Sequence, residues 1–258
     1  MKAEEIFRLD GQVALVTGAS SGLGSRFAEV AAANGASVVL VARRAERLEA
    51  LKEKIETAGG RAAVAEADVT DRTAMARAFD AAEKAFGTVT LLVNNAGVAH
   101  ADRAVEMPAD EWRRVMQTNL DAVFFTAQEA ARRMLAAKKR GSIINIASIL
   151  GLGVSKGTVA YAAAKAAVIQ MTKTLALELA FKGVRVNAIA PGFVVTEINR
   201  EFLTGEGAAM TRHIPAGRFG EESDLDGAFL LLASDAGRFM AGSVVVVDGG
   251  QVLAIPPG

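Results

Sequence analysis

The chain has 258 residues, with 29 basic and 29 acidic side chains and a formal net charge of zero, which argues against a broad nucleic-acid-binding surface. Apolar residues make up 51% of the chain, enough to bury a large core, so a disordered chain and a small disulfide scaffold are excluded. Cysteine is absent, which excludes a thiolate nucleophile and a cysteine-ligated zinc or iron–sulfur centre.

Seven short apolar runs recur along the chain and predict buried strands. They span residues 12–18, 36–42, 60–68, 89–95, 141–148, 183–191 and 243–249. Alanine-rich segments with helical spacing lie between them, at 43–58, 71–86, 111–139 and 161–182. Continuous apolar strands that alternate with helices are typical of a parallel sheet covered on both faces. We therefore predict an α/β fold with a doubly wound sheet of about seven strands, in a single domain over residues 1–258.

The first apolar run continues directly into a glycine-rich turn. Gly18, Gly22 and Gly24 have the spacing G-x-x-x-G-x-G between that strand and a helix. Glycine there permits positive φ and a close approach of backbone to phosphate, and the first N–H groups of the helix attract a pyrophosphate. Because the turn lies at the first β–α junction, it favours a dinucleotide site over an ordinary tight turn.

The end of the second apolar run bears on which dinucleotide binds. Folds that select NAD carry an acidic residue there for the ribose 2′-hydroxyl, whereas this chain has Ala42 followed by Arg43 and Arg44. A guanidinium can hold a 2′-phosphate in bidentate fashion. We expect NADP(H) to be preferred over NAD(H), with Arg43 as the contact and Ser20 or Ser21 assisting. The alternative is that both arginines are solvated residues at the start of a helix.

The only tyrosine is near two other reactive groups. Lys165 follows Tyr161 by four residues, so both project from one face of a helix, and Ser148 ends the fifth strand at the ligand-binding edge of the sheet. A phenol with a pKa of about 10 is a weak base at neutral pH unless a cation stabilises its anion. Taken singly, each residue is better explained by an ordinary role: Tyr161 as an interface aromatic, Lys165 as a solvated lysine and Ser148 as a helix cap. Together, downstream of a dinucleotide turn, they indicate acid/base catalysis.

From about residue 9 to about residue 250 the sequence resembles the short-chain dehydrogenase/reductase family, particularly members like the 3-oxoacyl-carrier-protein reductases. The matching motifs are TGASSGLG (17–24), Asp68-Val69, NNAG (94–97), Asn119, Ser148, Tyr161-x-x-x-Lys165 and PGFVVT (191–196). The resemblance implies a Rossmann-type fold and an NAD(P)-dependent oxidoreductase that acts on CH–OH groups. It also implies a homotetramer or homodimer.

The resemblance implies a role for each residue of the catalytic set. Tyr161 would be the acid/base, and Ser148 would orient the carbonyl oxygen of the substrate. Lys165 would bind the nicotinamide ribose and lower the pKa of the tyrosine. Asn119 would hold the geometry of its helix and a water that relays protons. No metal is required by this mechanism.

The resemblance assigns the cofactor site as well. Asp68 and Val69 would contact the adenine, and Thr196 would hold the carboxamide. The full set expected to bind the cofactor is Gly18, Ser20, Ser21, Gly22, Leu23, Gly24, Arg43, Asp68, Val69, Asn95, Ala96, Gly97, Tyr161, Lys165, Pro191, Gly192, Val194 and Thr196.

A long connection without a predicted strand, at about 192–223, is expected to form a substrate loop. The predicted pocket residues are Phe193 and Phe202 in this loop, Leu150 and Val154 after the serine, and His100 after the fourth strand. A histidine in a loop is more often simply solvated. This largely apolar set favours a hydrophobic ketone over a charged sugar acid.

The sequence therefore predicts NADP(H)-dependent reduction of a ketone, 3-oxoacyl or otherwise hydrophobic, to a secondary alcohol. The alternative is NAD-dependent oxidation of a secondary alcohol, polyol or sterol, and a more distant one is a dinucleotide-binding protein without catalysis. We expect no membrane or nucleic-acid partner. The first residues, MKAEEIFRLDG, lack an apolar core of signal-peptide length, so we expect a cytoplasmic location.

Overall fold

Seven parallel strands form one sheet in the order β3-β2-β1-β4-β5-β6-β7. The computed structural model describes residues 2–197 and 199–253. The strands are β1 (Val13–Thr17), β2 (Ser37–Ala42), β3 (Arg61–Glu66), β4 (Leu91–Asn94), β5 (Gly141–Ile146), β6 (Val184–Pro191) and β7 (Val244–Val247). The predicted doubly wound, Rossmann-type sheet is thus confirmed. Its strand order reverses between β1 and β4, which is where open α/β sheets bind ligands.

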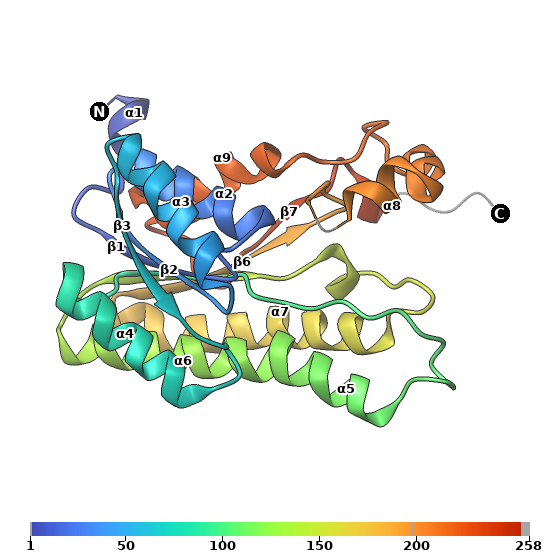
Figure 1. The fold of residues 1–258 in the computed structure, drawn as a ribbon, viewed down its shortest axis with the longest axis horizontal. Helices are drawn as coiled ribbons and strands as arrows, with labels where there is room; N and C mark the ends of the chain where they lie inside the picture. Colours follow the sequence, from blue (N-terminus) through green and yellow to red (C-terminus); the bar gives the residue numbers. More distant parts are fainter. Residues whose placement is uncertain (1, 198, 254–258) are drawn as a thin grey trace.

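Helices cover both faces of the sheet (Figure 1). One face carries α2 (Gly22–Ala33), α3 (Ala45–Thr57) and α9 (Asp226–Ala233), and the other carries α4 (Arg72–Phe86), α6 (Ala122–Ala136) and α7 (Val159–Leu179). A short helix α1 (Ala3–Ile6) precedes the sheet. β1 and β2 are buried along their whole length. This agrees with their sequences, which are apolar on both faces of the sheet.

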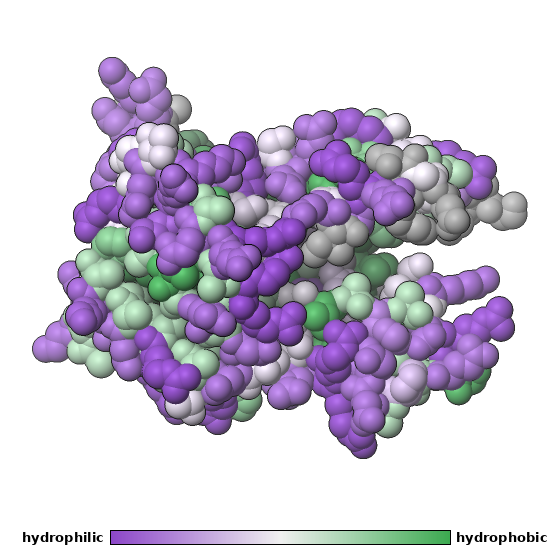
Figure 2. All heavy atoms as spheres, in the orientation of Figure 1, coloured by the Kyte–Doolittle hydropathy of each residue, from purple (hydrophilic) through white to green (hydrophobic). Residues whose placement is uncertain are grey.

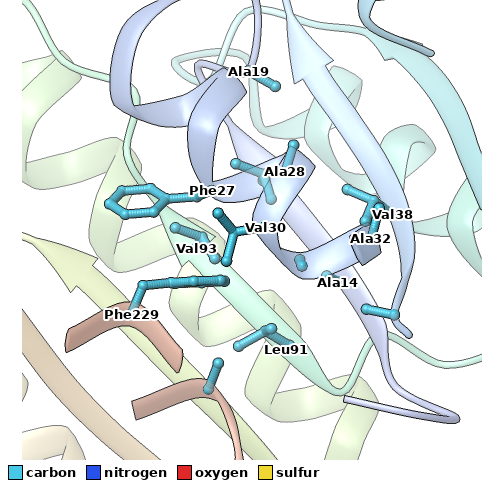
Figure 3. Close-up of a cluster of buried hydrophobic side chains, with 14 of the residues drawn as sticks. Ala14, Ala19, Phe27, Ala28, Val30, Ala32, Val38, Leu91, Val93 and Phe229 are labelled. Carbon is cyan, nitrogen blue, oxygen red and sulfur yellow. The ribbon is translucent and has the colours of Figure 1, made fainter. Parts of the chain in front are cut away.

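The core beneath α2 connects distant parts of the chain. Phe27 of α2 and Phe229 of α9 are both fully buried, and their ring centroids lie 5.0 Å apart (Figure 3). Aromatic pairs of this kind add about 0.5–1.5 kcal/mol beyond the burial of their area. The contact holds the last helix against the first crossover helix and thereby fixes α2, whose N-terminus carries the glycine-rich turn.

The predicted helix at 111–139 is interrupted by a turn of different geometry. It consists of α5 (Ala109–Met116), a π-helical turn (Gln117–Asp121) and α6, which ends at Ala136. Lys138 then has φ 54°, which a helix cannot contain, so the chain leaves the helix before the predicted end.

The predicted substrate loop has short elements of its own. It contains α8 (Arg200–Thr204), a 3₁₀ turn (Glu206–His213) and a second 3₁₀ turn (Glu222–Leu225). Gly220 N donates to Phe193 O at 2.9 Å and Val195 N donates to Gly220 O at 2.8 Å, so the two ends of the loop are paired. None of the described helices combines the length and apolar character that a bilayer crossing requires.

Candidate active site

The glycine-rich turn is packed too tightly for other residues. Gly18 has φ +68°, and a Cβ built on it would lie 2.9 Å from the Cα of Ala96. A Cβ on Gly24 would lie only 2.3 Å from the carbonyl oxygen of Gly18. The Thr17 hydroxyl accepts hydrogen bonds from the N–H groups of Asn95 (3.0 Å) and Ala96 (3.1 Å). The turn after β1 and the segment after β4 are therefore held together at the point where the strand order reverses.

The N-terminus of α2 is suited to an anion. Ser21 is its N-cap residue, yet its side chain makes no capping hydrogen bond, so the N–H groups of the first turn are not used by this cap. Arg44 Nη2 donates to the hydroxyls of Ser20 and Ser21, at 2.8 Å each. Backbone donors, hydroxyls and a guanidinium at one helix terminus are the groups that bind a phosphate. This chain's residues thus fit a phosphate-bearing dinucleotide.

Arg44, rather than the predicted Arg43, contacts Ser20 and Ser21. Arg43 Nη1 instead lies 3.7 Å from Asp68 Oδ2, on the side expected to hold adenosine. Burial raises the pKa of Asp68, but hydrogen bonds from Thr70 and the charge of Arg43 outweigh it and bring that pKa below its ordinary value. Arg43 stays a predicted cofactor contact, and Arg44 becomes a second candidate for such a contact. The two arginines are adjacent in sequence, so spacing alone does not distinguish them.

Ser148, Tyr161 and Lys165 come together at the ends of β5 and α7. Ser148 and Lys165 are 8% and 3% exposed. Lys165 Nζ donates a 2.7 Å hydrogen bond to Ile146 O and lies 5.6 Å from the centroid of the Tyr161 ring. Burial lowers the pKa of Lys165 to about 8. Burial raises the pKa of Tyr161, and a hydrogen bond with Ser148 partly offsets this.

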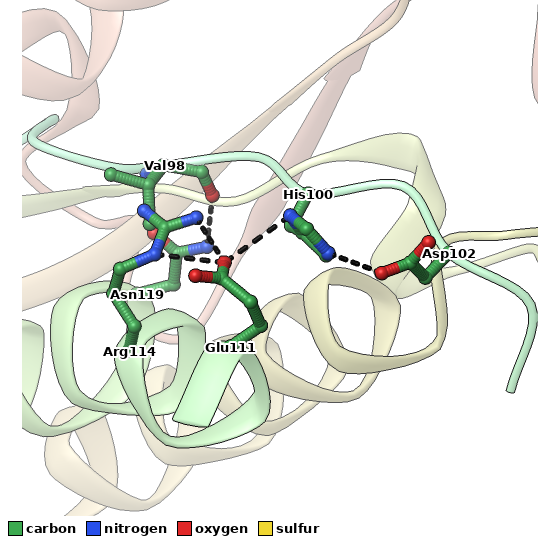
Figure 4. A network of polar contacts seen from close by, with 6 residues as sticks. All are labelled: Val98, His100, Asp102, Glu111, Arg114 and Asn119. Carbon is green, nitrogen blue, oxygen red and sulfur yellow. Dashed lines mark hydrogen bonds and ion pairs between the residues drawn. The ribbon is translucent and has the colours of Figure 1, made fainter. Parts of the chain in front are cut away.

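Asn119 lies in the π-helical turn and is fully buried. Its Nδ2 donates to Val98 O at 2.7 Å and its Oδ1 accepts from Val98 N at 2.8 Å (Figure 4). Both backbone groups of Val98 are thereby satisfied by one side chain. A π turn carries one extra residue and is frequent at functional sites, and here it directs Asn119 to the loop after β4.

Among the predicted pocket residues, His100 lies between two acidic side chains. Its Nε2 lies 2.6 Å from Asp102 Oδ2, and its Nδ1 lies 3.2 Å from Glu111 Oε2, which also accepts from Arg114 (Figure 4). Asp102 N donates to Gly157 O at 3.0 Å, which connects this loop to the one after Ser148. His100 is therefore part of a polar network, and its contact with substrate stays a prediction.

The remaining predicted pocket residues differ in their surroundings. Val154 is 92% exposed, Leu150 is partly buried, and the ring of Phe193 packs edge-on against Phe219 at 6.5 Å. The side chain of Phe202 lies outside the described part of the structure. The surface is indented between the part of the molecule that contains α8 and the part that contains α5 (Figure 2). No group of three or more His, Asp or Glu side chains that could hold a metal lies within residues 2–197 and 199–253.

A parallel sheet with a glycine-rich turn at its switch point, and a serine–tyrosine–lysine group that follows β5 and continues into α7, are the features of an NAD(P)-dependent oxidoreductase acting on CH–OH groups. The family model for short chain dehydrogenases matches residues 12–207. The chain therefore belongs to the short-chain dehydrogenase/reductase family, as its motifs predict.

Relatives of known activity match over almost the whole chain. The gluconate 5-dehydrogenase of Gluconobacter oxydans is 37% identical over 99% of this chain and 100% of its own. The galactitol 2-dehydrogenase of Cereibacter sphaeroides is 42% identical over 98% of this chain and 100% of its own. The 3-oxoacyl-[acyl-carrier-protein] reductase of Thermotoga maritima is 36% identical over 95% of this chain and 100% of its own.

Solved structures agree with the fold. A gluconate 5-dehydrogenase from Burkholderia cenocepacia, in complex with NADP and tartrate, superimposes with a TM-score of 0.93 at 36% identity, over 98% of this chain and 100% of its own. A putative 2-deoxy-D-gluconate 3-dehydrogenase from Agrobacterium tumefaciens with bound NADP gives 0.89 at 40% identity, over 96% of this chain and 99% of its own.

Proposed function

We propose that this protein interconverts a secondary alcohol and a ketone with NADP(H), on a small polyhydroxylated substrate such as a polyol or sugar acid. The group formed by Ser148, Tyr161 and Lys165 carries the proposal of reaction type. The hydrogen bonds from Arg44 to the two serines of the glycine-rich turn support a preference for NADP(H), because they place a guanidinium beside the N-terminus of α2.

Each side chain of the catalytic group has a separate role in this proposal. In the reducing direction Tyr161 Oη donates a proton to the carbonyl oxygen, and the Ser148 hydroxyl orients that oxygen. An ammonium has three donors, and Ile146 O takes one from Lys165, which leaves two for the ribose and for the tyrosine side. The nicotinamide, when bound, supplies or accepts the hydride. Asn119 keeps the loop after β4 in place through Val98.

The substrate class rests on two kinds of support. Relatives at 37% and 42% identity are named for gluconate and galactitol. The network of His100, Asp102 and Glu111 makes the loop after β4 polar, and Val154 is exposed rather than part of an apolar wall. Both favour hydroxylated substrates over the hydrophobic ketone expected from the sequence. A 3-oxoacyl substrate is the second candidate, supported by the relative that reduces such a group at 36% identity.

A substrate panel tests the proposal. Gluconate, galactitol, D-threitol, a 3-oxoacyl thioester and a hydrophobic ketone are each assayed with NADP(H) and NAD(H), and kcat/KM is compared, with Tyr161→Phe as the inactive control. The expected result is the largest kcat/KM for a polyhydroxylated compound with NADP(H). A preference for the thioester or for NAD(H) would overturn the corresponding half of the proposal.

The assembly is part of the same proposal. Leu177 and Phe181, at and just beyond the end of α7, are each 82% exposed, which supports a face covered by a second copy in a homodimer or homotetramer. Light scattering after size-exclusion chromatography tests this. The single-domain organisation and the cytoplasmic location stay predictions from the sequence.

A further inference from the structure

An ion pair joins two segments that lie 150 residues apart in the chain. Arg47, in the first turn of α3, donates from Nη1 to Glu197 Oε2 at 2.6 Å and from Nη2 to Glu197 Oε1 at 3.0 Å. These two parallel hydrogen bonds make a bidentate contact. The side chains are 44% and 61% exposed, so the pair contributes little to the stability of the fold itself.

The two partners come from opposite sides of the proposed cofactor site. Arg47 follows β2 and lies one helical turn beyond Arg44, which contacts the serines of the glycine-rich turn. Glu197 directly follows Thr196, the residue expected to hold the nicotinamide carboxamide. A Cβ built on Gly22 would lie 3.5 Å from the Thr196 side chain, so the segment with Glu197 lies against the glycine-rich turn.

Glu197 is part of a small hydrogen-bonded turn that includes Thr196. Thr196 N donates to Asn199 Oδ1 at 2.7 Å, and Asn199 Nδ2 donates to Val194 O at 2.9 Å. A contact that holds Glu197 therefore also holds Thr196 and Val194, both of them proposed cofactor residues. The Arg47 guanidinium keeps the pKa of Glu197 below its ordinary value, with a smaller effect of Arg44, so Glu197 is ionised at neutral pH.

We propose that Arg47 and Glu197 form a clasp that retains the bound dinucleotide, joining the adenosine side of its site to the nicotinamide side. The inference rests on the proposed cofactor. Opening the clasp accompanies cofactor release, so the pair slows dissociation and acts alike on NADP(H) and NAD(H). Arg47 and Glu197 are positioning residues, since they act through the segments that carry the cofactor contacts.

A rival role for the same residues predicts the opposite sign. If Arg47 were instead a ligand of the 2′-phosphate, Glu197 would compete for its guanidinium and repel the phosphate. Glu197→Gln would then tighten NADPH binding, and Arg47→Gln would weaken NADPH binding without affecting NADH. For a clasp, both substitutions accelerate release, and the effect is the same for both nucleotides.

The test measures release of NADPH from the full-length protein by its fluorescence during a chase with excess NADP⁺, and the Kd of NADPH and NADH by titration. Arg47→Gln and Glu197→Gln are each expected to raise the dissociation rate about two- to five-fold, as the loss of one exposed pair implies. The double variant should be no faster than either single one, because both remove the same contact.

Lys54→Gln is the matched control, because it also removes one positive charge and one ion pair, with Glu29 at 2.7 Å, from the same helix. Its release rate is expected to equal that of the wild type. Unchanged rates in the Arg47 and Glu197 variants, additive effects in the double variant, or slower release from Glu197→Gln would overturn the clasp while leaving the proposed function intact. Failure of the wild type to bind either nucleotide would overturn both.

Discussion

Lys165 donates its hydrogen bond to the carbonyl of Ile146, the last residue of β5, two positions before Ser148. The contact spans 19 residues and fixes the register of α7 against β5. Because Tyr161 lies in α7 and Ser148 follows β5 by two residues, this one backbone carbonyl aligns the proposed acid/base with the residue proposed to orient the substrate. The ammonium reaches that carbonyl only by being buried, which lowers its pKa to about 8.

This burial makes stability depend on pH in a defined window. The pKa of Lys165 is about 8 in the folded protein and 10.5 when unfolded, so between these values the unfolded chain binds more protons. The free energy of unfolding should therefore rise from pH 8 to pH 10, by about 2 kcal/mol. Urea denaturation at pH 7 to 10 measures it. Lys165→Met should abolish the rise, whereas Lys173→Met, an exposed lysine of the same helix, should retain it. Equal slopes in all three proteins would contradict the assigned burial.

Tyr161→Phe should separate binding from chemistry. The ring remains, so its packing and the NADPH Kd should stay within about two-fold, while kcat should fall by about 10²–10⁴ with the loss of the proton donor. Fluorescence titration and steady-state rates measure the two quantities. Turnover close to that of the wild type would remove the tyrosine from its proposed role.

Arginine substitutions should reveal how the cofactor is selected. Arg44→Ala should lower kcat/KM for NADPH about 10- to 100-fold and leave that for NADH nearly unchanged, because it removes the charge-assisted contact proposed for the 2′-phosphate. Arg43→Ala should have a smaller effect on the same ratio, since its guanidinium lies beside Asp68. A larger effect at Arg43 would support the original assignment from the sequence, and equal losses with both nucleotides would contradict selection by either residue.

Alanine at Gly24 should destabilise the protein, because its Cβ would meet the Gly18 carbonyl oxygen at 2.3 Å and neither backbone can move freely. We expect a loss of about 1–3 kcal/mol in the free energy of unfolding, measured by urea denaturation. Gly227→Ala is the control, since no atom lies within 4 Å of a Cβ at that exposed position in α9. It should be neutral or stabilise the helix by up to about 1 kcal/mol. Similar losses at both positions would indicate a helix effect rather than a clash.

The strands were predictable because buried parallel strands have a simple pattern. Residues 37–42 are buried at every position, and their sequence is a continuous apolar run with almost no polar interruption. Part of the candidate site was predictable from helical spacing. Tyr161 and Lys165 are four residues apart in α7, so their spacing in sequence brings them to one face of the helix.

Other features depend on contacts that spacing does not encode. The π-helical turn at Asn119 lies between segments with ordinary helical periodicity, so nothing in the pattern distinguishes it from an α-helix. The choice of Arg44 over Arg43 at the serines depends on the direction in which the chain passes from β2 into α3. The contact of Arg47 with Glu197 joins residues 150 positions apart, and no local signal precedes it.

The π-helical turn also limits which changes in length this helix tolerates. Deleting one residue within Gln117–Asp121 would let α5 and α6 join as an uninterrupted α-helix, with regular hydrogen bonding along its length. The flanking helices α5 and α6 would keep their relative orientation, because the wide turn absorbs the extra residue. The change would fall on Asn119, whose amide would no longer be held beside Val98. The extra residue therefore makes the backbone of this helix less regular and, by doing so, brings one amide to both backbone groups of Val98.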